Sequence, residues 1–182
     1  MPIDQKYRDM VDAKLAANSS EIFGNFSTEH AGYIIAQFIS KAEKSIEILS
    51  GEFADSFYDG IYVRPLLEQA AERIGKNGGK IRIITIDGYR SGHLTAMADE
   101  INKSCGEEVI VYLPASCKNP ERMNHYMVVD NMRYRLEEPH EMPKDGKAPE
   151  CVKAEICCNG PQKAAQLLQR FNSAWSQLDP GK

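Results

Sequence analysis

Apolar residues recur at intervals of three and four along several stretches of the chain, the spacing that places them on one side of an α-helix. This pattern predicts helices over residues 31–42, 65–76, 92–103 and 161–178. Between the first three helices, short runs rich in isoleucine and valine predict strands over residues 45–50, 80–86 and 108–113. Helices that alternate with strands in this way form β-α-β units, which favour a parallel sheet with right-handed crossovers.

The pattern changes in the second half of the chain. Residues 124–129 and 132–137 flank the turn pair Asp130-Asn131 and therefore predict a β-hairpin. Residues 138–150 contain three prolines and few apolar side chains, which indicates a loop, and a strand over 151–158 precedes the last helix. The predicted fold class is α/β, an α-β-α sandwich around a mixed, mainly parallel sheet.

The first hairpin strand contains the segment MNHYMVVD, which runs from Met123 to Asp130. Together with the element order over residues 28–178, this segment resembles one half of the phospholipase D-like superfamily, whose signature is His-x-Lys-(x4)-Asp. Aligned on Asp130, Met123 stands where the family has its nucleophilic His, and His125 stands where it has its phosphate-holding Lys. A thioether cannot form a phosphoenzyme. The resemblance therefore implies a degenerate half and a catalytically inactive member, although an ordinary half-buried strand ending in a turn would show the same residues.

The resemblance divides the chain into an N-terminal helical extension, residues 1–26, and a phospholipase D-like domain, residues 27–182. Four apolar residues of the extension predict an amphipathic helix: Tyr7, Met10, Val11 and Leu15. Its apolar side packs either on its own sheet or on another subunit, and residues 3–17 are the candidate contact for a protein partner. Active members of the superfamily bring two copies of the motif together, so the resemblance also implies a homodimer.

Candidate ligand residues gather in the loops after the predicted parallel strands, because α/β sheets bind ligands beyond the carboxyl ends of their strands. These residues are Glu52, Tyr58, Asp87, Arg90 and His93. The second loop leads into a helix N-terminus, which attracts anions. The topology places the start of the hairpin near the same rim, where His125 would complete one cleft. Alternatively, these side chains form solvent-facing pairs that contribute little.

Arg133 and Arg135 are two residues apart on the second hairpin strand, so their side chains point to one face. A guanidinium is suited to binding a phosphate or a carboxylate. These residues either contact a phosphate or partner, or pair with Glu137 or Glu155.

Composition limits the classes of function. The 182 residues suffice for one domain, and a net charge of -4 with scattered lysines and arginines does not indicate a broad DNA-binding face. No apolar run approaches the roughly 18 to 20 residues that cross a bilayer, and the polar opening does not resemble a signal peptide, so we expect a cytoplasmic protein without membrane contact. The five cysteines are expected to be reduced. Because Cys-x-x-Cys and His-x-x-x-His spacings are missing, neither a metal nor another cofactor is expected.

Three functions remain open. The first is a noncatalytic domain that binds a phosphate-containing ligand such as a nucleotide, a nucleic-acid end, or a protein. The second is a metal-independent phosphodiesterase or nuclease with rearranged residues, in which His125 acts with His93 or Asp130. The third is a structural subunit that docks through residues 3–17. The loss of both family residues at once favours the first function, since neither the nucleophile nor its phosphate-holding neighbour remains.

Overall fold

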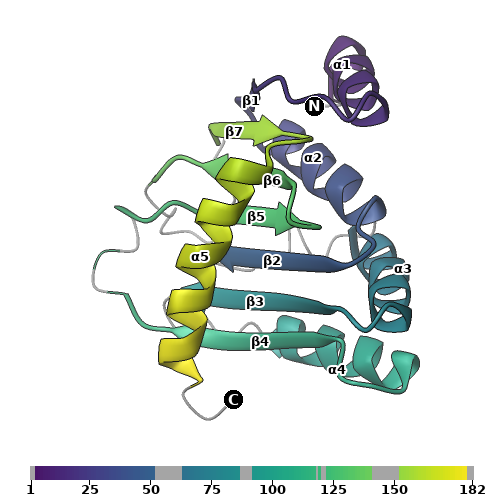
Figure 1. The fold of residues 1–182 in the computed structure, drawn as a ribbon, viewed down its shortest axis with the longest axis vertical. Helices are drawn as coiled ribbons and strands as arrows, with labels where there is room; N and C mark the ends of the chain where they lie inside the picture. The colour runs from purple at the N-terminus through teal and green to yellow at the C-terminus, as the bar shows by residue number, and fades with distance from the viewer. Residues whose placement is uncertain are drawn as a thin grey trace.

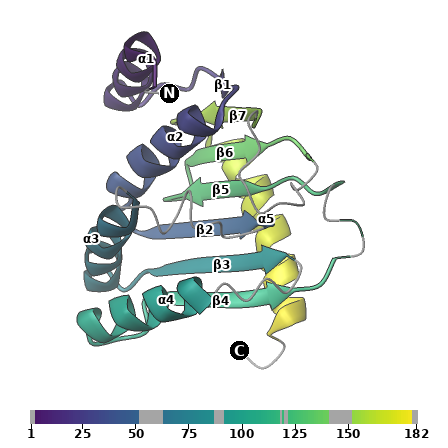
Figure 2. The ribbon, with the colours of Figure 1, turned by 180° about the vertical axis from the view of Figure 1, so that it is seen from behind.

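The computed structural model describes residues 3–51, 63–86, 92–117, 119, 122–140 and 152–179. In these residues a seven-stranded sheet lies between two layers of helices (Figure 1). The helices are α1 (Gln5–Ala16), α2 (Thr28–Ser40), α3 (Val63–Lys76), α4 (Gly92–Cys105) and α5 (Pro161–Leu178). Helices α2, α3 and α4 cover one face of the sheet, and α5 crosses the other face (Figure 2). The predicted α-β-α sandwich is confirmed.

The strands are arranged in the order β1-β7-β6-β5-β2-β3-β4. They are β1 (Phe23–Asn25), β2 (Ser45–Ser50), β3 (Lys80–Ile86), β4 (Ile110–Ala115), β5 (Tyr126–Val129), β6 (Arg133–Glu137) and β7 (Ala154–Cys157). Strands β2, β3 and β4 pair in parallel, and the other four pairings of the described strands are antiparallel. The sheet is mixed, as predicted, but antiparallel pairings outnumber parallel ones, because crossover helices join only β2, β3 and β4 to one another.

Local signals explain where the elements begin and turn. The hydroxyl of Ser27 accepts a hydrogen bond from the amide of His30 at 3.2 Å and so caps α2. The hairpin turn contains three residues, 130–132, between the paired Val129 and Arg133, one more than predicted, and Asp130 and Asn131 in it have positive φ, 53° and 60°. Strand β1 was not predicted, because three residues are too few to show a period.

The hydrophobic core has two parts, one on each side of the sheet. The larger part fills the space beneath α2, α3 and α4, and it includes the fully buried Phe38. The smaller part lies beneath α5 around the fully buried Phe171. The buried Val11 of α1 belongs to the larger part, and Tyr7, Met10 and Leu15 pack against it. Of the two placements considered for α1, the structure therefore shows packing on its own chain. No described helix has the length and hydropathy needed to span a membrane.

Candidate functional site

The two polar residues of the degenerate motif lie at opposite ends of β5. His125 immediately precedes the first residue of β5, and Asp130 immediately follows the last. Five residues of extended chain span about 16 Å at a rise of about 3.3 Å per residue. The structure therefore does not bring Asp130 to His125, and Asp130 is too distant to act as its catalytic partner.

Asp130 instead holds the hairpin to the start of β2. Its carboxylate accepts hydrogen bonds from the backbone amides of Glu43, Lys44 and Ser45 at 2.7 to 3.1 Å. The Nη1 atom of Arg133 lies 3.2 Å from the same carboxylate. Charge-assisted bonds of this kind are stronger than neutral ones. The geometry gives Asp130 a structural role, and it engages Arg133, one of the two predicted phosphate-binding arginines.

Met123 is partly buried and packs against the hydrophobic cluster beneath α5. Strand β5 begins only at Tyr126, so the alternation of side chains along a strand does not extend to Met123. Met123 therefore contributes apolar packing at the position where the resembling family has its nucleophile.

His125 belongs to a cluster of polar residues that the hairpin brings together. Its Nδ1 atom lies 3.2 Å from Oε1 of Glu137, and Nε2 of His140 lies 2.6 Å from that same oxygen. The two imidazole rings meet edge to face, with their centroids 5.3 Å apart. A carboxylate only accepts hydrogen bonds, so each of these ring nitrogens donates. One carboxylate oxygen thus orients both imidazoles.

Arg135 occupies the other side of Glu137. Its Nη1 donates to Oε2 of Glu137 at 2.6 Å, and its Nε donates to Oδ1 of Asn25 in β1 at 3.1 Å. Asn25 in turn donates to the carbonyl of Val152 at 2.5 Å. The side chain of Arg135 is only 5% exposed, and its Nη2 atom is buried without a hydrogen-bond partner among the described residues. We refer to His125, Arg135, Glu137 and His140 as the His125 cluster.

The charges of the cluster are strongly coupled. Burial alone would raise the pKa of Glu137, but hydrogen bonds from His125 and His140 and the charge of Arg135 outweigh it and hold that pKa well below its ordinary value. Nearby, burial raises the pKa of Tyr7 to about 12, partly opposed by the charge of Arg135. Glu137 is therefore an anion at neutral pH. Helix α1 places Tyr7 close enough to Arg135 for that charge to act on the pKa of the Tyr7 hydroxyl.

The cluster offers three groups that bind metal ions in other proteins. His125, Glu137 and His140 each supply one donor atom, and these atoms all lie within 4.8 Å of one another. The side chains of His125 and Glu137 are 11% and 10% exposed, whereas that of His140 is 19% exposed. A ligand would therefore reach the cluster from the side of His140.

The predicted cleft at the ends of the parallel strands falls largely outside the described residues. Glu52, Tyr58, Asp87 and Arg90 lie there, and so does the side chain of His93, whose backbone is part of α4. The pairing of β5 with β2 sets Tyr126 opposite Leu49, one residue before the end of β2. His125 therefore lies beside this rim of the sheet. That the loop residues and His125 line one cleft stays a prediction.

Glu137 and His140 were not proposed as site residues from the sequence. The predicted two-residue turn at Asp130-Asn131 would place residue 125 opposite residue 136, so the register predicted from the sequence did not indicate Glu137. The observed turn contains one residue more, 130–132, which sets Tyr126 opposite Leu136 and brings Glu137 opposite His125, and the amide of Glu137 donates to the carbonyl of His125 at 2.8 Å. His140 lies beyond the end of β6, where no strand register reaches it.

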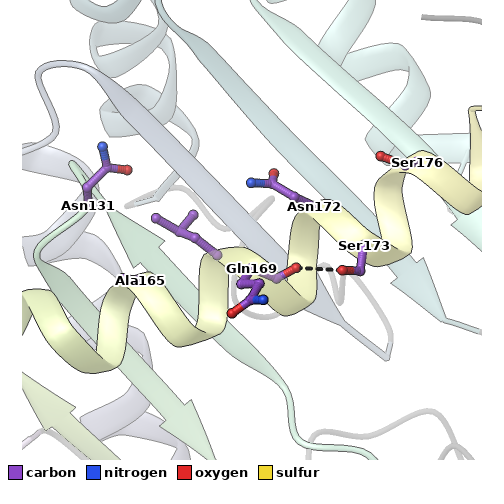
Figure 3. Close-up of a pocket in the computed structure, with 7 residues that line it drawn as sticks. Asn131, Ala165, Gln169, Asn172, Ser173 and Ser176 are labelled. Atoms are coloured by element: carbon purple, nitrogen blue, oxygen red, sulfur yellow. Dashed lines mark hydrogen bonds between the residues drawn. The ribbon is translucent and has the colours of Figure 1, made fainter.

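A hollow lies along α5, on the face of the sheet that α5 covers (Figure 3). It has a volume of about 960 Å³ and is open to solvent. Its lining is uncharged and consists of Asn131, Ala165, Leu168, Gln169, Asn172, Ser173 and Ser176. None of these lining residues is an acid, a base or a metal ligand, so the lining gives no reason to treat the hollow as a candidate site.

Comparisons with known proteins identify the fold. No protein-family model matches the chain, and no curated protein matches its sequence. Among solved structures, Nuc from Salmonella typhimurium, a phospholipase D family member, is 20% identical with a TM-score of 0.61, and the match covers 86% of this chain and 95% of Nuc. NucT from Helicobacter pylori is 10% identical with a TM-score of 0.53, and the match covers 84% of this chain and 95% of NucT.

A third similar structure is TrmBL2, an archaeal chromatin protein described with a novel mode of DNA binding. It is 9% identical with a TM-score of 0.60, and the match covers 95% of this chain and 60% of TrmBL2. At these identities the likeness concerns the fold. The chain has the phospholipase D-like fold, as the resemblance predicted.

Proposed function

We propose that this chain is a noncatalytic phospholipase D-like domain that binds a phosphate group, carried by a nucleotide or a nucleic-acid end, at the His125 cluster. The observation that carries the proposal is the buried Arg135, whose Nη2 has no hydrogen-bond partner in the described part of the chain, while two imidazoles contact the carboxylate that Arg135 also contacts. Guanidinium and imidazolium groups are the donors that proteins use for phosphate oxygens.

The contacts of the motif residues support the proposed absence of catalysis. Met123 supplies no nucleophile, and the carboxylate of Asp130 is occupied by three backbone amides and Arg133. The DNA binding described for TrmBL2 supports a nucleic-acid ligand. The net charge of -4 favours a short end or nucleotide over a long duplex, which requires many phosphate contacts.

Binding is tested by fluorescence anisotropy with a short single-stranded oligonucleotide that carries either a 5′-phosphate or a 5′-hydroxyl. The protein is first treated with chelator. We expect tighter binding of the phosphorylated oligonucleotide, competition by inorganic phosphate, and a loss of about 10-fold in affinity in His140→Gln, because the hydrogen bond from the imidazole to the phosphate is removed. The matched control is Arg170→Gln, which removes a positive charge from the exposed side of α5 and should leave affinity unchanged. Equal affinity for both oligonucleotides, or no effect of His140→Gln, would contradict the proposal.

The second candidate function, a metal-independent phosphodiesterase, is favoured by one contact. Glu137 lies 3.2 Å from Nδ1 of His125, and a carboxylate in that position orients an imidazole whose other nitrogen can attack or accept a proton. The test is hydrolysis of bis(p-nitrophenyl) phosphate, with and without chelator, by the natural chain and by His125→Ala. Activity that resists chelator and disappears in the variant would establish this function. Hydrolysis no faster than the uncatalysed background would exclude the phosphodiesterase function.

Assembly and location remain predictions. A homodimer is expected from the resemblance, and sedimentation of the purified chain measures it. A protein partner at residues 3–17 would have to use the outer side of α1, because its apolar residues already pack on the core of this chain. Deletion of residues 3–17 tests whether assembly depends on this helix. Fractionation of cells tests the cytoplasmic location.

A further inference from the structure

We infer that His125, Glu137 and His140 form a binding site for a divalent transition metal ion, with Zn²⁺ as the ion that suits these donors. The site differs from the expectation drawn from the sequence, in which no metal was foreseen. It also goes beyond phosphate binding, since an ion would bind there whether or not a phosphate ligand follows.

The three donors have the chemistry of known zinc sites. Two imidazole nitrogens and one carboxylate oxygen are common ligands of Zn²⁺, and three protein ligands leave a fourth position for water or a substrate. His125 and Glu137 face each other across β5 and β6, and His140 follows three residues after Glu137. Two of the donors are thus fixed by the hydrogen-bonded ladder of the sheet.

All three donor atoms lie within 4.8 Å of one another, and the two distances to the carboxylate oxygen are close to those of a metal centre. Ligand bonds of about 2.0 to 2.1 Å in a tetrahedron place donor atoms about 3.3 Å apart. The distance from Nδ1 of His125 to Oε1 of Glu137 is 3.2 Å, which meets this requirement. The distance from Nε2 of His140 to that oxygen is 2.6 Å, a hydrogen bond that must lengthen by about 0.7 Å. His140 lies in irregular chain after β6, where such a shift is easily made.

The surroundings supply the second layer of contacts that metal sites use. Arg135 holds Oε2 of Glu137 at 2.6 Å and leaves Oε1 to the ion. Asn25 holds Arg135 in turn, at 3.1 Å. Such partners fix ligand orientation, and their loss typically weakens metal binding about 10- to 100-fold.

The positive charge of Arg135 also determines which fourth ligand the ion prefers. Arg135 and Glu137 cancel each other, so an ion bound by two neutral imidazoles leaves a net charge of about +2 in a largely buried site. An anion at the fourth position relieves this charge. Metal and phosphate should therefore strengthen each other's binding, and this one consequence rests on the proposed function.

The alternative is that the three residues form only a hydrogen-bonded cluster. The test uses the full chain, stripped with chelator and dialysed, and titrated calorimetrically with Zn²⁺ in a buffer free of phosphate. We expect one equivalent to bind and His140→Gln to weaken binding by more than about 100-fold, a larger loss than an outer partner causes. The matched control is His30→Phe, because His30 stacks on Tyr7 at a centroid distance of 3.7 Å and the phenyl ring preserves that stacking. His30→Phe should bind like the natural chain.

A second measurement keeps the inference testable if His140→Gln fails to fold. Co²⁺ bound by the natural chain should give the visible spectrum of a tetrahedral nitrogen and oxygen site without a thiolate charge-transfer band. No stoichiometric Zn²⁺ binding, unchanged affinity in a folded His140→Gln, or a thiolate band would each overturn the inference. Because the oligonucleotide assay is performed with chelator, failure of metal binding and failure of phosphate binding are distinguished.

Discussion

Replacing Glu137 by glutamine removes one charge from the centre of the His125 cluster and almost nothing else. Glutamine has the size of glutamate and keeps one oxygen acceptor, so the packing around β6 is preserved. What it removes is the anion that Arg135 contacts at 2.6 Å and that both imidazoles contact through Oε1. Arg135 would then be a buried cation whose hydrogen-bond partners, Asn25 and the glutamine oxygen, are both neutral.

The expected cost follows from this burial. Removing one partner of a buried ion pair typically costs about 3 to 5 kcal/mol, because the other charge stays behind without compensation. Arg135 is 5% exposed and its Nη2 already lacks a partner among the described residues, so water does not replace the lost carboxylate without local opening. We therefore expect Glu137→Gln to lower the free energy of unfolding by about 3 to 5 kcal/mol. The matched control is Glu138→Gln at the exposed neighbouring position, which should stay within about 0.5 kcal/mol of the natural chain.

The dependence on pH provides a second test of the same residue. The folded-state pKa of Glu137 lies below its unfolded value of about 4.3, so its contribution to stability is complete above that pH and is lost as the pH falls toward the folded pKa. The difference in stability between the natural chain and Glu137→Gln should therefore be largest at neutral pH and shrink below about pH 4.3. A group with a raised pKa would show the opposite trend.

The assay is urea unfolding, followed by circular dichroism in the presence of chelator. For an unfolding slope of about 2 kcal/mol/M, the expected loss moves the midpoint down by about 1.5 to 2.5 M. A midpoint within about 0.5 M of the natural chain at pH 7, or a difference that grows on acidification, would refute the assignment of Glu137 as the ionised centre of the cluster.

Four further substitutions, two of them compared as a pair, test the fold, each by urea unfolding. Gly79→Ala would place its new Cβ on the carbonyl oxygen of Lys44 and should lower the free energy of unfolding by at least about 3 kcal/mol. Gly78→Ala, at φ +70° with nothing nearby, should lower it by only about 1 to 2 kcal/mol. Equal losses would exclude the backbone contact at Gly79. Asp130→Asn weakens the bonds to the amides before β2 and should cost about 2 to 3 kcal/mol; a neutral result would leave Asp130 available for another role. Phe171→Ala empties the core beneath α5 and should cost about 3 to 5 kcal/mol; a loss below about 1 kcal/mol would show that α5 is not held by this residue.

Much of the fold was predictable because its elements carry strong local signals. The bounds of β2 and β3 were predicted as observed, since isoleucine-rich runs end at clear turns. Helix α2 follows a capping serine, and α5 begins at Pro161 and continues in a regular apolar pattern. Strand β1 escaped prediction because its position depends on pairing with β7, about 130 residues later in the chain. A pairing over such a separation leaves no local period to read.

The candidate site was likewise predictable only in part from the sequence. The motif predicted His125 and Asp130 as site residues, but they lie at opposite ends of β5. The carboxylate of Asp130 instead accepts hydrogen bonds from backbone amides at the start of β2. The alternation of β6 correctly placed Arg133 and Arg135 on one face. Only the tertiary contacts decide that one pairs with Asp130 and the other with Glu137.

The sequence by itself determined the longer elements, the position of the hairpin and the missing nucleophile at Met123, because these follow from neighbouring residues and from side-chain chemistry. The tertiary structure alone decided that Asn25, His140 and the hairpin meet around one carboxylate. Coulombic and hydrogen-bonding energies depend on distance and burial in space, and residues 25 and 140 acquire a common neighbourhood only when the sheet has formed.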